Sequence, residues 1–471
     1  MRLNTTRSAL LALGFLLLLV LTGLPLAIGV GAQRAYQALL RSTYQALPVG
    51  WVLVEQYERG WFSSHATAEL TRQPATGPAP AAQPTRIRLD SRIDQSPWSW
   101  FSAGLFPAAA HVTTRADWVD GPIPLPPLFI DTTVGADGSG RAHLLVPASN
   151  QSTGQSRPPD GDRLLNQTIT GTLYFRPSPP RAALDLRIPS VGLDTAAGPR
   201  ARLTGTRIKA ELTDWSGGIA TGHISLATAS ARFNPAPQTS PTGQEALVEQ
   251  LTLTLEQAPS EPAPARRLNL KLNAAADLLR LDGIAYRSPV VGLSAQSLDA
   301  QTVTDIAGAL RTLSSEAATP AMRGLVGATL LAQLLPRLMA SSPSVELNPF
   351  TLSTPDGPVA GHLALAVKGH DGPTNGAAAV LGALLGGGPA NWLNALTGDG
   401  DLALPRPIAL AWLARADATG TTSPADQLQA LSDGGWITAQ DGRIASTLRL
   451  ASGKLRINGK KIRLSWPGLG G

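Results

Sequence analysis

The chain has 471 residues, of which 43% are hydrophobic and 15% are charged, so it can form two or three folded units and is too apolar for a disordered polyelectrolyte. It has no cysteine, which excludes disulfides, thiolate metal sites and cysteine nucleophiles. The net charge of +6 divides into +4 from residues 1–41, +6 from residues 441–471 and −4 from the body between them. Because the net positive charge lies at the two ends and no nucleic-acid-binding motif is present, we expect no nucleic-acid partner.

The first element is an apolar segment at the N-terminus. Residues 9–32 carry no charge, and as a helix with a rise of about 1.5 Å per residue they could cross a hydrocarbon core of about 30 Å. Arg2 and Arg7 precede the segment and favour a cytoplasmic N-terminus over residues 1–8. We therefore expect a transmembrane signal anchor. The alternative is a secretory signal cleaved after Ala32, which ends a run of small residues.

Residues 33–48 are predicted to form a short juxtamembrane helix, and region 49–300 is predicted to be antiparallel β-structure. Polar and apolar residues alternate at every step in Leu251–Leu255 and Leu268–Leu272, so each strand has one dry and one wet face. Proline-rich breaks between such stretches predict surface loops. Parallel strands would instead be apolar throughout and would alternate with crossover helices. The other strands expected in this region are 52–57, 66–71, 85–93, 111–119, 142–146, 167–175, 183–188, 203–215 and 222–233.

Region 301–471 combines helical and strand patterns and ends in a basic β-hairpin. Two carboxylates flank a glycine in Asp399-Gly400-Asp401, where we expect a plain turn because the later ligands of a calcium loop are missing. The predicted fold class is α+β: an N-terminal transmembrane helix, then a large, curled, mostly antiparallel β-sheet body with a few helices packed on one side. The predicted helices are 302–340, 377–385, 391–396 and 407–414, and the predicted strands are 344–352, 359–367, 442–450, 454–458 and 461–466.

Two segments resemble a known family. Residues 55–67, EQYERGWFSSHAT, resemble the opening signature of the YdgA-like family of bacterial proteins of unknown function, and residues 451–460 resemble that family's C-terminal hairpin. The resemblance implies a single-pass protein of the bacterial inner membrane with a β-rich body in the periplasm, and it brings no reaction or cofactor. The signature residues are Tyr57, Arg59, Gly60, Trp61, Phe62, Ser63, Ser64, Asn458, Gly459 and Lys460.

Catalytic and metal-binding patterns are weak throughout the sequence. Ser63, Ser64 and His65 place two hydroxyls beside a base, but neighbouring side chains of a strand point to opposite faces, so a turn with structural contacts is the favoured interpretation. The six histidines lack metal-ligand spacing, and no phosphate-binding or nucleophile motif appears. We expect no catalytic site, no metal and no cofactor.

The C-terminal strands carry a stronger signal. Lys454, Arg456, Lys461 and Arg463 share one predicted face, while the apolar residues between them share the other. One interpretation is a sheet face kept soluble by charge. The other is a contact surface for anionic lipid headgroups or an acidic partner.

These patterns favour a non-enzymatic, inner-membrane-anchored periplasmic protein that binds lipid or another apolar ligand in a sheet groove. In outline this resembles the AsmA-like envelope lipid-transport proteins. One alternative is a structural or assembly protein, acting as a homodimer or as a partner in an envelope complex. A second is an envelope hydrolase, which depends on Ser63, Ser64 and His65 alone.

Overall fold

The computed structural model describes the strand-rich parts of the chain. They form two compact units, the first ending at residue 214 and the second beginning at residue 215. The predicted segments 1–8 and 9–32, and residues 33–48 apart from isolated positions, lie outside the described residues. So do the helices predicted within 302–340 and 377–396, again apart from isolated positions at their ends. Aside from isolated positions, the described ranges are 51–72, 85–96, 108–120, 125–135, 137–149, 163–195, 198–213, 220–234, 245–260, 267–281, 283–301, 341–367, 396–416, 423–451 and 453–462.

Within those ranges, no helix is long and apolar enough to cross a membrane. The helices that are described, α7 (Arg406–Ala416) and α8 (Pro424–Asp433), both belong to the second unit. α7 confirms the helix predicted over 407–414, whereas α8 was not predicted.

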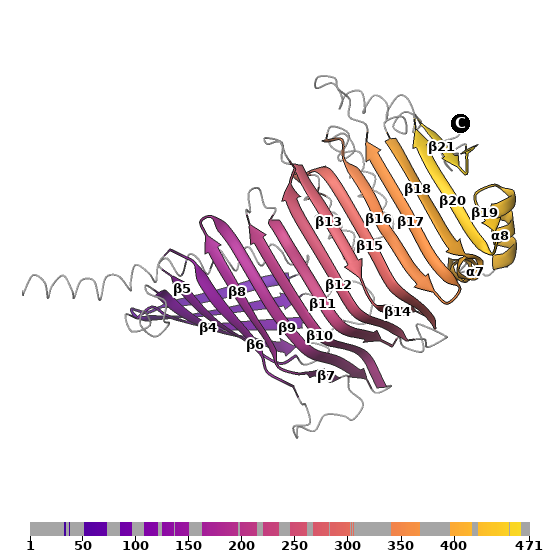
Figure 1. The fold of residues 1–471 in the computed structure, drawn as a ribbon. Coiled ribbons are helices and arrows are strands. Elements are labelled where there is room, and N and C mark those ends of the chain that lie inside the picture. The colour runs from indigo at the N-terminus through magenta and orange to yellow at the C-terminus, as the bar shows by residue number, and fades with distance from the viewer. Residues whose placement is uncertain are drawn as a thin grey trace, which may run out of the picture. The chain divides into compact units, whose positions relative to one another are not determined.

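The first unit is an antiparallel sheet in which sequence neighbours usually pair. The pairing order is β1–β2–β3–β4–β5–β6–β8–β9–β10, and β7 pairs with the end of β9 on the edge that β8 also uses, opposite β10 (Figure 1). Its strands are β1 (Trp51–Arg59), β2 (Ser63–Arg72), β3 (Thr85–Asp94), β4 (Ala108–Asp120), β5 (Leu128–Gly135), β6 (Gly140–Val146), β7 (Arg163–Asn166), β8 (Ile169–Pro177), β9 (Pro180–Thr195) and β10 (Gly198–Thr213).

Small side chains fill the buried face of the first unit. Ala66, Ala68 and Ser91 are each at most 1% exposed. Ser91 lies directly opposite Thr114, and their hydroxyl oxygens are 2.9 Å apart, which satisfies both polar groups within the sheet. In β2 the residues on this face are more buried than their neighbours at every step, which is the alternation that the sequence predicted.

The second unit is also antiparallel and orders its strands β11–β12–β13–β15–β16–β17–β18–β20–β21–β22 (Figure 1). β14 pairs with β12 and β15, and β19 pairs with β20. Its strands are β11 (Thr221–Phe233), β12 (Ala246–Pro259), β13 (Arg267–Ala275), β14 (Leu278–Leu281), β15 (Ile284–Asp299), β16 (Ser344–Thr354), β17 (Gly357–Val367), β18 (Leu396–Pro405), β19 (Thr438–Gln440), β20 (Arg443–Ala451), β21 (Lys454–Ile457) and β22 (Lys460–Ile462).

The turn predicted at Asp399-Gly400-Asp401 is wrong, because these residues lie inside β18. Their glycines face the side chains of the neighbouring strand: a Cβ added at Gly398 would lie 2.5 Å from Leu365 Cδ2, and one at Gly400 would lie 3.0 Å from Leu363 Cδ1. Glycine therefore marks a close side-chain approach within the sheet and not a change of chain direction. Strands β5, β7, β14, β15 and β19 were also not predicted.

Helices α7 and α8 cover one end of the second sheet's apolar face. Val359 of β17, Leu404 of β18 and Ile444 of β20 are each at most 5% exposed, and they pack with Ile408 of α7 and Leu428 of α8. Ser423 caps α8, since its side chain accepts a hydrogen bond of 3.1 Å from the Asp426 amide. The helices thus bury one end of a face that continues along the strands.

The first unit contains an ion pair whose strength depends on pH. Arg207 Nε donates to Asp185 Oδ1 at 2.9 Å, and this hydrogen bond, outweighing partial desolvation, lowers the pKa of Asp185 below its ordinary 3.8. A carboxylate with a depressed pKa in the folded state stabilises the fold above its ordinary pKa. That stabilisation is lost as the pH falls through the lower, folded-state value.

We therefore expect Asp185→Asn to lower the melting temperature at pH 7, with the difference from the wild type disappearing well below pH 3.8, the ordinary value. Thermal unfolding followed by circular dichroism at several pH values measures this. Glu211→Gln, an exposed substitution on the paired strand, is the control. A difference that stays constant down to low pH would contradict the assigned ion pair.

Candidate functional site

The opening signature forms a turn at residues 60–62, and hydrogen bonds from a buried glutamine hold this turn in place. Gln95 is 0% exposed, and its side-chain amide donates to the carbonyl oxygens of Gly60 at 3.1 Å and Trp61 at 3.4 Å. Its backbone amide donates to the Phe62 carbonyl oxygen at 2.8 Å. A Cβ at Gly60 would lie 2.3 Å from the Ser63 carbonyl oxygen, so this turn accepts only glycine there.

This turn presents two aromatic side chains to solvent. Trp61 is 61% exposed and Phe62 is 44% exposed. Ser64 points into the sheet, where its hydroxyl donates to Gln95 Oε1 at 3.5 Å, whereas His65 lies on the exposed face, 3.7 Å from Asp90. The fold therefore separates Ser64 from His65, as strand alternation predicted. Ser63 shares the exposed face with His65, and within the described part of the chain no hydrogen bond joins the two.

The closing signature is a second structural turn. Asn458 and Gly459 have φ values of 49° and 78° and connect β21 to β22 as a tight hairpin. Asn458 Oδ1 accepts from the Thr447 amide at 2.8 Å, and Asn458 Nδ2 donates to the Gly435 carbonyl oxygen at 3.2 Å. The Lys460 side chain crosses Gly435, where a Cβ would lie 2.3 Å from Nζ. These signature residues therefore join β20, the hairpin and the segment after α8.

The polar face of the second sheet carries a charged row that sequence reasoning did not assemble. Residues directly opposite one another in an antiparallel ladder share a face, so the strand registers place one residue from each strand in line. The row consists of His223, Glu256, Lys271, Ser294, Glu346, Ala364, Asp399, Arg449, Arg456 and Lys461.

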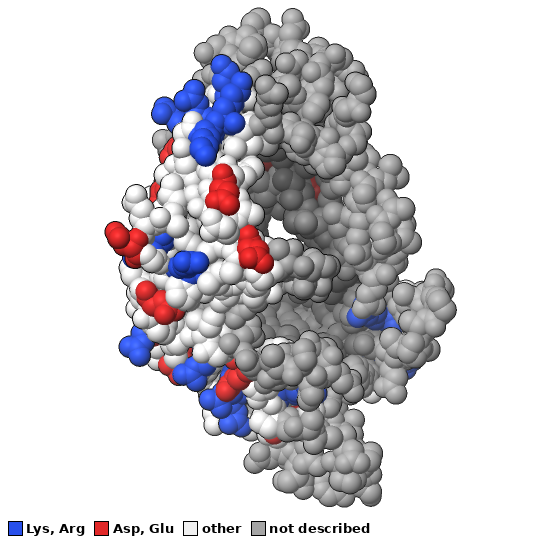
Figure 2. Space-filling model, turned by 90° about the vertical axis from the view of Figure 1, so that its right-hand side faces the viewer, with Lys and Arg blue, Asp and Glu red and all other residues white. Residues whose placement is uncertain are grey.

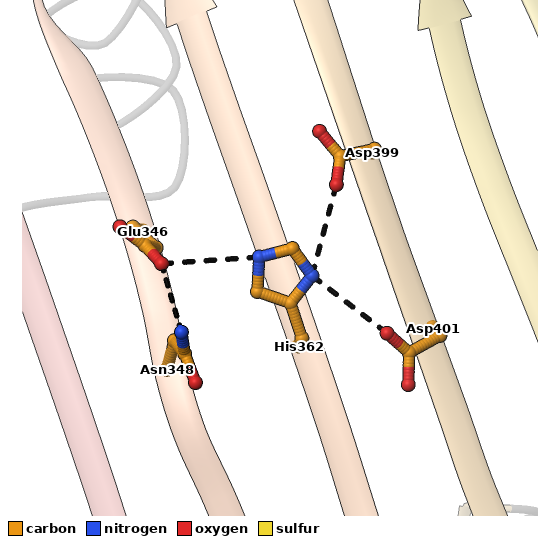
Figure 3. Close-up of polar contacts among 5 residues, drawn as sticks. All are labelled: Glu346, Asn348, His362, Asp399 and Asp401. Carbon is orange, nitrogen blue, oxygen red and sulfur yellow. Dashed lines mark hydrogen bonds and ion pairs between the residues drawn. The ribbon is translucent and has the colours of Figure 1, made fainter.

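Acidic residues surround a histidine on this face. His362 of β17 points between carboxylates from β16 and β18 (Figure 3). Its Nε2 lies 3.9 Å from Glu346 Oε1, and its Nδ1 lies 3.7 Å from both Asp399 Oδ2 and Asp401 Oδ1. Asn348 Nδ2 donates to Glu346 Oε1 at 2.9 Å and orients that carboxylate. Among the described residues no group of three His, Asp or Glu side chains has the geometry to hold a metal ion.

Basic residues follow immediately on the next strands. Arg449 of β20 lies opposite Arg456 of β21, which lies opposite Lys461 of β22, and all three are exposed. Of the predicted contact residues, the structure places Lys454, Arg456 and Lys461 on this face, while Arg463 lies outside the described residues. Figure 2 shows lysine and arginine side chains gathered at the top of the view, with acidic side chains below them.

A hollow of about 750 Å³ lies over these strands of the second unit. Two adjacent rows of the polar face line it, together with residues that alternate with those rows, among them Val345, Leu365 and Gly398. The first row comprises Glu346, Ala364, Asp399, Arg449 and Arg456, and the second comprises Ser344, Ala366, Thr397 and Ala451. Within the first row Ala364 lies between the two acidic residues, Glu346 and Asp399, and Asp399 lies directly opposite Arg449, so the acidic part of the hollow borders its basic part.

The opposite face of the same strands is apolar and partly uncovered. Val345 lies directly opposite Leu365, and Leu293 lies on the strand next to Val345. These three side chains are 38–39% exposed. We call them the apolar patch. It lies on the face that α7 and α8 cover at its other end, so only part of this face is buried.

A family model described as "bacterial protein of unknown function (DUF945)" matches residues 7–465, nearly the whole chain. No curated protein matches the chain, and neither does any solved structure.

The buried glutamine beneath the opening signature gives a stability prediction. We expect Gln95→Ala to lower the free energy of unfolding by about 1–3 kcal/mol, because the Gly60 and Trp61 carbonyl oxygens lose their buried donor. Urea unfolding measures this. Gln56→Ala, an exposed glutamine of the same hairpin, should change stability by less than about 0.5 kcal/mol. Equal effects would argue against Gln95 as the support of the turn.

Proposed function

Because the chain belongs to this family of bacterial proteins of unknown function, whose description assigns no reaction, we propose its role from its own residues. We propose a non-enzymatic, membrane-anchored envelope protein that binds lipid acyl chains on the apolar face of its second sheet. The proposed anchor is residues 9–32, and Arg2 and Arg7 before it favour an orientation with the bulk of the chain in the periplasm. The resemblance of residues 55–67 to the YdgA-like family supports the same proposal, because it implies an inner-membrane protein with a periplasmic body.

The observation that carries the proposal is the exposed apolar patch. Leu293, Val345 and Leu365 come from three adjacent strands and expose branched aliphatic side chains on one continuous face. Full burial of such a side chain gives about 1.5–3 kcal/mol, and these side chains, which are 38–39% exposed, would gain part of that when an apolar chain covers them. Gly398 and Gly400 of β18 add no side chain to this face and let Leu363 and Leu365 lie flat over the strand.

Lipid is the occupant we favour because a chain anchored through residues 9–32 is held beside acyl chains at high local concentration. A second copy of the chain could cover the same patch, which is the assembly alternative. The non-enzymatic part of the proposal rests on the lack of a catalytic motif in the sequence and on the separation of Ser64 from His65.

The test is native mass spectrometry of the full chain purified from membranes in mild detergent. We expect a mass matching the uncleaved chain with lipid retained. In the double variant Val345→Asp, Leu365→Asp we expect at least a tenfold loss of retained lipid per protein, because charged groups replace the apolar contacts.

Val54→Asp is the matched control, since Val54 is an equally simple exposed aliphatic side chain, 64% exposed, in the first unit. If the double variant and the control retain the same amount of lipid per protein, the lipid is bound at the anchor, which would contradict binding at the patch. A doubled mass without lipid would favour assembly, and a chain beginning at Gln33 would contradict the anchor.

A further inference from the structure

The three cations at the C-terminal end of the charged row, Arg449, Arg456 and Lys461, have no acidic partner in the described part of the chain. Arg449, Arg456 and Lys461 lie directly opposite one another on adjacent strands, an arrangement in which like charges repel. The acid beside them in the row is Asp399, opposite Arg449, and within the described part of the chain no ion pair joins these two side chains. The row thus places three exposed donors together, and a bound anion would relieve their repulsion.

The neighbouring end of the row has the opposite character. Glu346 and Asp399 lie on either side of Ala364, on strands separated by about 10 Å across two spacings. Alanine leaves the space between the two carboxylates free of a long side chain. His362 approaches both of them but only at 3.7–3.9 Å, longer than a hydrogen bond, so their oxygens keep capacity to accept from a ligand.

Both ends open into one hollow. Glu346, Asp399, Arg449 and Arg456 all line the same 750 Å³ space, and Ala364 lies between the two acids. Since Asp399 and Arg449 are direct cross-strand neighbours, the acidic and basic ends are separated by about 5 Å. A ligand for this hollow needs an anionic and a cationic group at that spacing.

We infer that the hollow binds a compound carrying a phosphate and a primary ammonium group joined by a short linker, as in phosphoethanolamine. The phosphate binds Arg449 and Arg456, which line the hollow, because guanidinium binds phosphate oxygens through paired hydrogen bonds, and Lys461, next to Arg456 on the adjacent strand, adds positive charge. The ammonium binds Glu346 and Asp399, which accept its N–H donors. This chemistry exists both as a free compound and as a phospholipid headgroup. The site lies on the face opposite the apolar patch, so the inference does not depend on acyl-chain binding there.

The test is isothermal titration calorimetry of the full chain in an uncharged detergent, with phosphoethanolamine, phosphocholine and inorganic phosphate as probes. We expect phosphoethanolamine to bind at least tenfold more tightly than the other two, because phosphocholine has no N–H donor and inorganic phosphate has no ammonium. Equal affinity for the three probes would overturn the inference.

Single substitutions test the basic and the acidic end of the hollow one at a time. Arg449→Gln and Arg456→Gln should weaken phosphoethanolamine and inorganic phosphate alike by at least tenfold. Asp399→Asn should weaken phosphoethanolamine by a similar factor and leave inorganic phosphate unchanged. Arg280→Gln, an exposed arginine of β14 outside the hollow, is the control and should change nothing. Losses of equal size in the control, or a loss of phosphate binding in Asp399→Asn equal to that in Arg449→Gln, would overturn the assignment.

A second set of titrations distinguishes a phospholipid headgroup from a free soluble compound as the ligand. Short-chain phosphatidylethanolamine and phosphatidylcholine are titrated in the same detergent. Binding of phosphatidylethanolamine alone, with the same dependence on Arg449 and Asp399, supports the inference and assigns the site to a headgroup. Binding of free phosphoethanolamine with that dependence supports it for a soluble compound. Binding in neither arm overturns it.

Discussion

The register of the antiparallel ladder is the constraint on which the second unit depends. Each strand alternates its side chains, and each pairing places direct partners on the same face, so one residue per strand is aligned across the sheet. A shift of one residue in a single pairing would move Arg449 to the apolar face and Leu448 to the polar face. The charged row and the apolar patch are therefore two consequences of one register.

Turns and buried polar groups hold this register without a large aromatic core. Asn458 joins the final hairpin to β20 and to Gly435, so the strands that carry the basic residues keep their alignment with β18. In the first unit, Gln95 does the same for the hairpin of β1 and β2. Both signature segments thus owe their residue choice to backbone geometry and buried hydrogen bonds. Their exposed members, Trp61 and Phe62, have no such structural reason for being aromatic.

The two faces of the second sheet suit different chemistry on the same strands. Leu365 and His362 are three residues apart on β17, yet one belongs to the apolar patch and the other to the acidic group. Helices α7 and α8 add asymmetry, because they bury Val359, Leu404 and Ile444 at one end of the apolar face and not Leu365 at the other. The exposed part of each face is where binding is proposed.

Sequence patterns alone predict the β-rich character, most strand positions and helix α7, because alternation, proline breaks and helical periodicity are local signals that tertiary contacts did not override. The sequence also predicted that Ser64 and His65 would face opposite sides, and it placed Lys454, Arg456 and Lys461 on one face. It failed at Asp399-Gly400-Asp401, where glycine serves a close side-chain approach within β18, a reason invisible without the neighbouring strand. Arg449 follows the same alternation as Arg456 and could have been found from it. Only the tertiary structure brought Glu346, His362, Asp399 and Arg449 together, because they come from four strands whose pairing partners and register are set by long-range contacts.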